Sequence, residues 1–403
     1  MNEQDNVKKF STEKKEAADE NTEAVKEKKG YSKILLVLCS IFCVVLVAVY
    51  FLGGFDTLGN AFSSGNEDVY DSSVVGSDGF PVSFTSNDIK AVESFSSRLF
   101  VLTEKILTCI RSNGEVEYTK TFTFVEPEIT VSDKFGLIYD RASSKYLLFN
   151  SKVTVYEGSP EGDRHIVTAT VDSKGNMAFA TKSEDSACRV YLVDKNGNIM
   201  FIWSCAEEYA VKLDISSDAK EILCAALGAY NGEIYTKLYK LNIKDDKKQK
   251  EYVASGTACV DVSFYGKDKA IVTCLDKRIL FNLNTDDGAP VESEFPTEGM
   301  LIDSDSNGYT AVLCNKITSF ENDEAILYDK NNSVIYKTDV PDGIIDMVVI
   351  GKKVYCLTAD SVIYLTDNGE VKKTVECEAK GNGLAVMDKK AYYYSLGTLR
   401  TGF

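Results

Sequence analysis

The chain has 403 residues, of which 44% are apolar and 26% charged, with 22 Tyr and 20 Phe against six Pro. This composition excludes a disordered or collagen-like chain and favours a β-rich core. The net charge of −16 arises after residue 33, because the first 33 residues hold eight lysines and eight acids. An acidic domain without a basic aromatic patch predicts no nucleic-acid partner.

Four regions follow one another along the chain. Residues 1–33 are rich in Lys and Glu and poor in apolar side chains, which predicts a disordered tail. Residues 34–52 are 19 residues without a charge, about 28 Å long as a helix, which predicts one transmembrane span. Residues 53–78 are rich in Gly, Ser, Asp and Asn and are predicted to form a flexible stalk, followed by a folded domain over residues 79–403.

The charges around the predicted span indicate its orientation. Four lysines precede it between residues 26 and 33, and the next basic residue after it is Lys90. Positive charge stays on the cytoplasmic side, so we expect a cytoplasmic tail and an extracellular domain on a single-pass cell-membrane protein. The alternative is a cleaved signal peptide, but the polar lead-in and the apolar core are both longer than such a peptide has.

The folded domain repeats one short pattern. Segments such as TVDSKGNMAFA from Thr170 and KLDISSDAKEILC from Lys212 each hold an apolar strand, a polar turn and a second apolar strand. Most units continue with a second hairpin, with Asn-Gly turns at Asn113-Gly114, Asn196-Gly197 and Asn368-Gly369. The first and last of these turns lie six units apart, which gives a period of about 42 residues, typical of propeller blades. The sequence predicts an all-β propeller of four-stranded blades.

The unit count predicts eight blades, with seven as the alternative. The blades are expected to begin near Asp88, Pro127, His165, Tyr209, Ala258, Gly299, Gly343 and Gly383. The last unit has room for only about three strands. We expect the segment GFPVSF, residues 79–84, to supply the missing strand, which would pair the two ends of the domain in one sheet and hide its edges.

Nine of the eleven cysteines follow the predicted span, where an oxidising exterior favours disulfides. Four of them, Cys224, Cys274, Cys314 and Cys356, fall in the second strand of successive units, at spacings of 50, 40 and 42 residues. Equivalent positions of neighbouring blades lie about 10 Å apart, which exceeds the reach of a disulfide. The cysteines are therefore predicted to be free and buried.

Few residues offer chemistry. His165 is the only histidine and stands at the start of a predicted strand, which excludes multi-histidine metal sites and favours a solvated or capping role. The sequence contains no G-x-S-x-G elbow, Walker loop or CxxC pair. Trp203, the only tryptophan, lies in a predicted outer strand and is expected to pack between blades. No catalytic residue, cofactor or cofactor-binding residue is predicted.

The stretch IDSDSNGYTAV, residues 302–312, places Asp303, Asp305 and Asn307 at the spacing that opens an EF-hand calcium loop. The twelfth position is Cys314 instead of the required glutamate, and both flanks are predicted to be strands. We therefore expect the hairpin turn between the first two strands of the sixth blade, and no metal site. Weak adventitious calcium binding is the alternative.

The units RVYLVDKNGNIMFIW and YAVKLDISSDAKEILCAAL, the FPVSF segment and the single predicted span resemble a family of uncharacterised membrane-anchored propeller proteins from clostridial-type Firmicutes. The chain is also similar to the broader quinoprotein and WD40-like propellers, which include lipoprotein propellers that scaffold outer-membrane assembly. The resemblance implies location and fold and carries no activity. One tryptophan argues against the docking motif that quinone-dependent propeller enzymes repeat from blade to blade.

Three functions are consistent with these features. The expected one is a scaffold or binding module that holds another envelope protein or polymer through one face or the central channel. The second is an enzyme that acts on cell-wall glycan with carboxylates, although 61 acids spread through the turns single out no pair. The third is a transmembrane sensor that signals through its N-terminal tail. An enzyme is not expected, and the binding residues are not predicted.

Overall fold

The computed structural model describes residues 74–75, 79–85, 88–160, 164–245, 249–284, 290–315 and 323–403. Within these ranges the regular elements are the β-strands β1 to β33. The predicted tail, the predicted span and most of the predicted stalk lie outside the described residues. The described residues include no helix that is long and apolar enough to span a bilayer.

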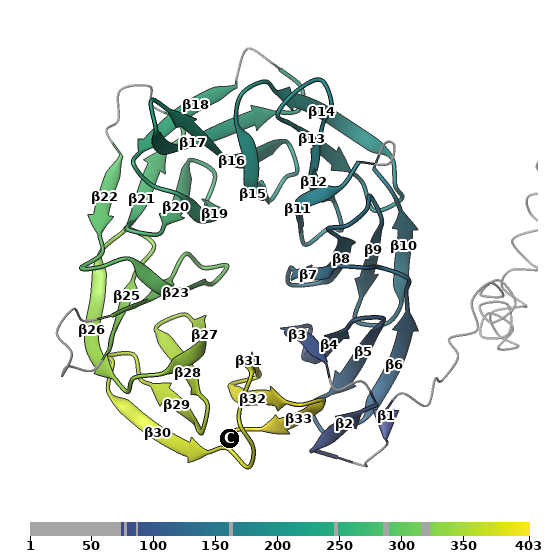
Figure 1. The fold of residues 1–403 in the computed structure, drawn as a ribbon, viewed down its shortest axis with the longest axis vertical. Helices are drawn as coiled ribbons and strands as arrows, with labels where there is room; N and C mark the ends of the chain where they lie inside the picture. The colour runs from purple at the N-terminus through teal and green to yellow at the C-terminus, as the bar shows by residue number, and fades with distance from the viewer. Residues whose placement is uncertain are drawn as a thin grey trace, which may run out of the picture. The chain divides into compact units, whose positions relative to one another are not determined.

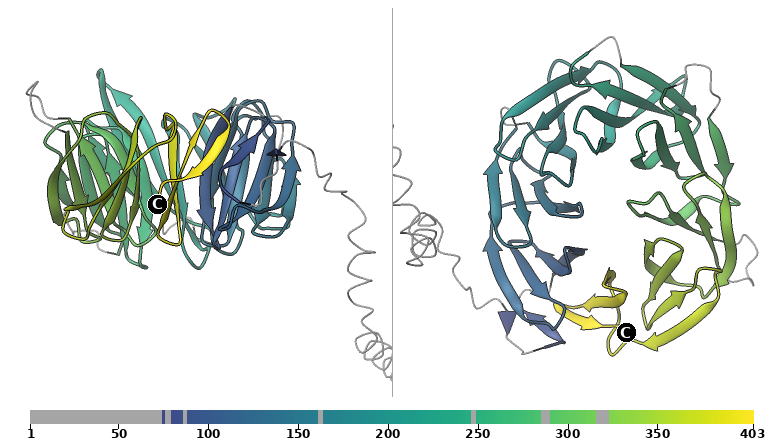
Figure 2. Two further views of the ribbon diagram at one scale, coloured as in Figure 1. Left: turned by 90° about the horizontal axis from the view of Figure 1, so that it is seen from below. Right: turned by 180° about the vertical axis from the view of Figure 1, so that it is seen from behind.

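The strands form eight antiparallel blades around a central channel (Figure 1; Figure 2). In each blade the first strand lines the channel and the last faces outward (Figure 1). Blades 1 to 4 comprise β3 (Ile89–Phe95), β4 (Arg98–Thr103), β5 (Ile106–Arg111) and β6 (Val116–Thr121); β7 (Pro127–Val131), β8 (Phe135–Asp140), β9 (Tyr146–Asn150) and β10 (Thr154–Gly158); β11 (Ile166–Val171), β12 (Met177–Lys182), β13 (Cys188–Val193) and β14 (Ile199–Cys205); and β15 (Tyr209–Ile215), β16 (Glu221–Tyr230), β17 (Glu233–Asn242) and β18 (Lys250–Ser255).

Blades 5 to 7 continue the same order. They comprise β19 (Cys259–Tyr265), β20 (Lys269–Cys274), β21 (Lys277–Asn282) and β22 (Val291–Glu294); β23 (Gly299–Ser304), β24 (Thr310–Cys314), β25 (Asp323–Tyr328) and β26 (Val334–Val340); and β27 (Ile344–Ile350), β28 (Lys353–Thr358), β29 (Ser361–Leu365) and β30 (Val371–Glu376). Each predicted blade start lies within one residue of an observed first strand. The prediction of eight blades is confirmed, and the alternative of seven is wrong.

Blade 8 closes the ring with strands from both ends of the domain. It contains β31 (Gly383–Met387), β32 (Lys390–Ser395) and β33 (Thr398–Thr401), and then β2 (Val82–Phe84) pairs with β33. Val82 is only 1% exposed, and the backbone N–H of Phe84 donates to the carbonyl of Gly397 at 2.8 Å. The predicted closure by residues 79–84 is therefore confirmed. A further short strand, β1 (Val74–Val75), pairs with β2 at the outer edge, inside the range predicted as a stalk.

The core is divided among the contacts between blades. Eight clusters of buried apolar side chains are present, and each joins two successive blades around the ring. In the cluster between blades 3 and 4, Trp203 of β14 packs against Tyr239 of β17 with ring centroids 4.7 Å apart. This contact confirms the prediction that the tryptophan lies between blades.

The cysteines contribute to these clusters as small apolar side chains. All nine cysteines of the described ranges are free, and eight of them are buried. Cys224, Cys274, Cys314 and Cys356 each end up in a different cluster between blades. The prediction of free, buried thiols is confirmed.

One buried charge also joins two blades. Arg278 of β21 is fully buried, and its guanidinium donates to Gly308 O and Asp329 O at 2.7 Å and to Thr310 Oγ1 and Asn332 Oδ1 at 3.1 Å. All four acceptors belong to blade 6 and none is a carboxylate. Burial lowers the pKa of Arg278 to about 10.

Candidate functional site

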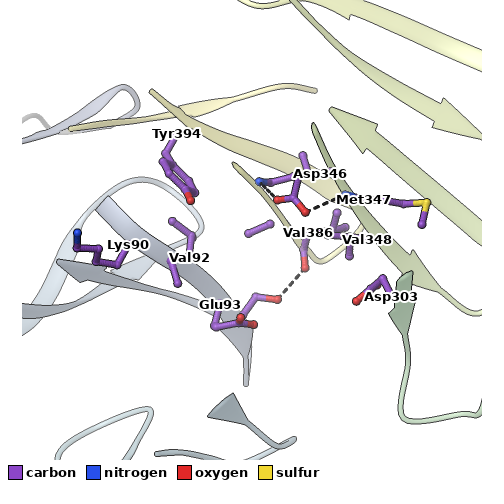
Figure 3. A pocket seen from close by; sticks show the side chains of 13 residues that line it. Lys90, Val92, Glu93, Asp303, Asp346, Met347, Val348, Val386 and Tyr394 are labelled. Atoms are coloured by element: carbon purple, nitrogen blue, oxygen red, sulfur yellow. Dashed lines mark hydrogen bonds between the residues drawn. The ribbon is translucent and has the colours of Figure 1, made fainter. Parts of the chain in front are cut away.

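A pocket of about 330 Å³ lies in the channel wall where blades 6, 7, 8 and 1 meet (Figure 3). Three carboxylates line it: Glu93 of β3, Asp303 of β23 and Asp346 of β27. The ring of Tyr394, on β32, forms another part of the wall. The pocket therefore combines acidic side chains that lie up to 253 residues apart in the sequence.

Bulges near the start of the inner strands direct these carboxylates to the channel. In a regular strand, residues two apart share a face, so Ile344 and Asp346 of β27 would point the same way. The register between β27 and β28 shifts between these two residues. Because a bulge inserts one extra residue, Ile344 is buried between blades while Asp346 lines the pocket. The same shift occurs in β3 and β23, before Glu93 and Asp303.

Two of the three carboxylates also hold neighbouring blades together. Asp303 Oδ2 accepts a hydrogen bond from the backbone N–H of Val349 on blade 7 at 2.6 Å. Asp346 Oδ2 accepts one from Leu384 on blade 8 at 2.7 Å. Within the described part of the chain the side chain of Glu93 makes no hydrogen bond, so its carboxylate in the pocket is available to a ligand.

The pocket carboxyls retain protons unusually well. Burial raises the pKa of Glu93 to about 7, and repulsion from Asp303 and Asp346 adds to the effect. Burial likewise raises the pKa of Asp303 to about 7 and raises that of Asp346. The charge of the pocket therefore changes near neutral pH, and a bound cation would favour the ionised forms.

The lysine at the pocket edge does not neutralise the carboxylates. Lys90 of β3 points away from the three acids (Figure 3), and its ammonium pairs with Asp88 and, at 3.8 Å, with Glu104. An ammonium or guanidinium group entering the pocket would meet the carboxylates as hydrogen-bond acceptors. The site is suited to a cationic side chain.

The EF-hand-like stretch forms the predicted turn between β23 and β24. Asp305 Oδ1 accepts from the backbone N–H groups of Asn307 and Tyr309 at 2.9 Å, and Oδ2 accepts from Gly351 on blade 7 at 2.7 Å. Gly308 supplies the positive φ, 80°, that the turn requires. These bonds occupy the side chain that a calcium ion would need. The described residues contain no group of three or more His, Cys, Asp or Glu side chains placed to hold a metal ion.

Sequence reasoning considered Asp303 only as a calcium ligand, and missed its partners in the channel. Glu93 and Asp346 had no local motif to single them out. The repeat did contain a signal for Asp303, because Asp214 of β15 occupies the same strand position as Asp303 of β23. Asp214 accepts a hydrogen bond from the backbone N–H of Phe264 in the next blade at 2.7 Å. His165 is exposed just before β11, as a solvated histidine would be.

A second pocket, of about 370 Å³, lies on blade 4 and was also missed. Its floor includes Glu208, which is only 2% exposed and accepts hydrogen bonds from Tyr239 at 2.6 Å and Tyr235 at 2.9 Å. Lys237 Nζ lies 3.5 Å from the same carboxylate. Burial opposes ionisation of Glu208, but the tyrosine and Cys205 hydrogen bonds outweigh burial and lower its pKa.

Solved structures share this fold at low sequence identity. BamB from Moraxella catarrhalis aligns with a TM-score of 0.53 and 10% identity over 81% of this chain and 98% of BamB. Sqt1 from Saccharomyces cerevisiae aligns with a TM-score of 0.55 and 12% identity over 78% of this chain and 95% of Sqt1. The C-terminal WD40 domain of Sif2 aligns with a TM-score of 0.58 and 10% identity over 81% of this chain and 97% of that domain. No curated protein matches the chain by sequence. One family model, described as a family of unknown function (DUF5711), matches residues 73–397, so the chain belongs to this family.

Proposed function

We propose that the protein is a membrane-anchored, extracytoplasmic binding module that holds another envelope protein by a basic side chain inserted into the channel pocket. The observation that carries this proposal is the convergence of Glu93, Asp303 and Asp346 on one space of about 330 Å³. Their mutual repulsion is relieved when a cation binds, and this relief contributes to affinity. The pocket has room for a single side chain or a short peptide segment.

A protein partner is proposed by analogy with other propellers of this fold. BamB and the WD40 domain of Sif2 share the propeller architecture, and at 10% identity this likeness extends to the fold alone. The proposed location rests on the uncharged run at residues 34–52 and its four preceding lysines. Protease added to intact protoplasts tests this location, because an extracellular domain is digested and a cytoplasmic domain is protected.

Site-specific photocrosslinking tests the binding proposal. A photoreactive residue at Val348, which lines the pocket, should give a reproducible adduct in native membranes, whereas one at Val371 on the outer strand β30 should not give that adduct. Glu93→Lys places a positive charge in the pocket and should abolish the adduct. Glu294→Lys, on the exposed strand β22, is the matched control and should leave it intact. An adduct that survives Glu93→Lys would show that the partner binds elsewhere.

The same carboxylates favour a second candidate function, glycan cleavage. A carboxyl with a pKa near 7 beside ionisable partners is what a general acid requires, and Glu93 meets this condition. Against it, the aspartates are already bonded to backbone amides of the next blade, which gives them a structural role. Release of sugars from purified wall fragments that is lost in Glu93→Gln would favour the enzyme over the scaffold.

A further inference from the structure

Cys188 and Cys205 lie directly opposite one another on β13 and β14, the two outer strands of blade 3. Opposite residues of antiparallel strands have Cα atoms about 4.5–5.5 Å apart, inside the range of about 4.4–6.8 Å that a disulfide spans. Both side chains belong to the same buried cluster. A disulfide between them therefore requires no backbone rearrangement.

The two sulfurs are not equivalent. Cys205 Sγ lies 3.2 Å from Glu208 Oε2 and 3.6 Å from the hydroxyl of Tyr239. Cys188 Sγ lies 3.4 Å from both the carbonyl of Glu208 and the backbone N–H of Ala210. The interaction with Cys188 and the Tyr239 hydroxyl lower the pKa of Cys205, against burial and the Glu208 carboxylate, which raise it, whereas the pKa of Cys188 is raised. Cys205 is therefore the more acidic thiol of the pair. The thiolate is the nucleophilic form of cysteine.

Both cysteines are buried next to the pocket on blade 4. Each cysteine is only 2% exposed. Glu208 both touches Cys205 and lines the pocket on blade 4, so one side chain separates the sulfur from a space open to solvent. Lys237, beside the Glu208 carboxylate, offsets the negative charge at this point. Glu208 is therefore the side chain that a small oxidant arriving from the pocket must pass to reach Cys205.

We propose that Cys188 and Cys205 form a site of reversible oxidation, at which hydrogen peroxide joins the two thiols in a disulfide between β13 and β14. The Cys205 sulfur attacks one peroxide oxygen, the O–O bond breaks, and the second oxygen leaves as hydroxide, which takes up a proton as water. The Cys188 sulfur then attacks the resulting sulfenic acid, the S–S bond forms, and the sulfenic oxygen leaves as a second water. Two thiols are oxidised as one peroxide is reduced to two waters.

A second cysteine pair provides an internal comparison. Cys259 of β19 and Cys274 of β20 are also direct cross-strand partners in one buried cluster. Burial raises the pKa of Cys259 well above its usual range and that of Cys274 to about 11, so neither is a thiolate near neutral pH. The geometry also differs, because Cys259 lies at the register shift of β19 and its Sγ donates to the carbonyl of Asp261 at 3.1 Å, whereas Cys188 and Cys205 pair in unbroken register. Oxidation should therefore be selective for blade 3.

Peptide mapping after peroxide treatment tests the proposal on the full-length chain, purified reduced in mild detergent. After brief exposure to hydrogen peroxide at pH 7.5, alkylation and non-reducing digestion, mass spectrometry should find the Cys188 and Cys205 peptides joined, and dithiothreitol should separate them. The Cys259 and Cys274 peptides should stay alkylated. This measurement needs no variant, so it does not depend on whether a cysteine substitution folds.

Two variants test the order of the steps. In Cys188→Ser, Cys205 should accumulate as a sulfenic acid that dimedone traps, whereas in Cys205→Ser, Cys188 should remain a thiol. Cys274→Ser is the matched control and should leave the blade 3 disulfide unchanged. Recovery of Cys188 and Cys205 as alkylated thiols in the oxidised chain, or equal oxidation of the Cys259–Cys274 pair, would overturn the proposal. Neither outcome bears on the channel pocket.

Discussion

The carboxylate of Asp303 on β23 accepts a hydrogen bond from the backbone amide of Val349 on β27 and so joins blade 6 to blade 7. Asp214 makes the same bond to Phe264 between blades 4 and 5. The amide of a buried residue such as Val349, 3% exposed, has no access to water, and leaving it unpaired is costly. An acidic side chain at this position of the inner strand therefore serves ring assembly, and in blade 6 it also lines the pocket.

Replacing Asp303 should show that the oxygen acceptor matters more than the charge. Asp303→Ala leaves the Val349 amide unpaired, whereas Asp303→Asn keeps an oxygen at the same place, so the alanine variant should have a free energy of unfolding lower by about 1–3 kcal/mol than the asparagine variant. Urea unfolding of the two variants is the measurement. Neither variant titrates at this position, so the comparison is free of the raised pKa of Asp303, about 7. Equal stability of the two variants, or a rise in the melting temperature of the intact protein on adding calcium, would contradict this account.

The fold was predictable from sequence because its signals are local. Each hairpin contains its own turn residues and alternating strands, and the β-turn that ends at Gly197 closes with a 3.0 Å hydrogen bond to Asp194 without help from other blades. The closure by β2 was predictable because the last unit lacked one strand. The short strand β1 was not, since two valines in a polar segment carry no pattern.

The candidate sites were less predictable because they depend on register and on distant contacts. The face to which Asp346 points is set by a bulge, and a single sequence does not mark which strand will contain one. The pairing of Cys188 with Cys205 could have been predicted from the sequence, because the two cysteines lie eight residues before and eight residues after the Asn196-Gly197 turn. A hairpin that is symmetric about its turn places such residues opposite one another, whereas the repeat spacing relates only cysteines of different blades.

Closure of the ring should make a large contribution to stability. Val82 and Phe84 of β2 are buried in the cluster between blades 8 and 1. Truncating both to alanine should lower the free energy of unfolding by about 3–6 kcal/mol, because apolar burial is lost and cavities remain. Deletion of residues 79–84 should lower the melting temperature at least as much. Ser83→Ala, between them, is the control and should change stability by less than about 1 kcal/mol. A deletion variant that melts like the intact protein would rule out this role.

Arg278 should contribute more to stability than its charged neighbour Lys277. Arg278→Met removes the only guanidinium from a site with four buried or partly buried acceptors, and should cost about 3 kcal/mol or more. Lys277→Met breaks a surface ion pair with Glu292 and should cost less than about 1 kcal/mol. Urea unfolding of the two variants at pH 7 makes the comparison. Similar losses would mean that the buried guanidinium is not a special link between blades 5 and 6.

The raised pKa of Glu93 predicts a pH-dependent effect of Glu93→Gln. The unfolded chain ionises this carboxyl near its ordinary value of 4.5 and the folded protein near 7, so between these values the unfolded state releases more protons. Glu93 therefore lowers the free energy of unfolding as pH rises through this window. Glu93→Gln should be neutral at pH 4 and stabilising at pH 8, by on the order of 1 kcal/mol after solvent screening. Urea titrations at both pH values measure the difference, and Glu370→Gln, at an exposed position, is the control. An effect of Glu93→Gln that does not change with pH would show that the pocket does not raise the pKa of Glu93.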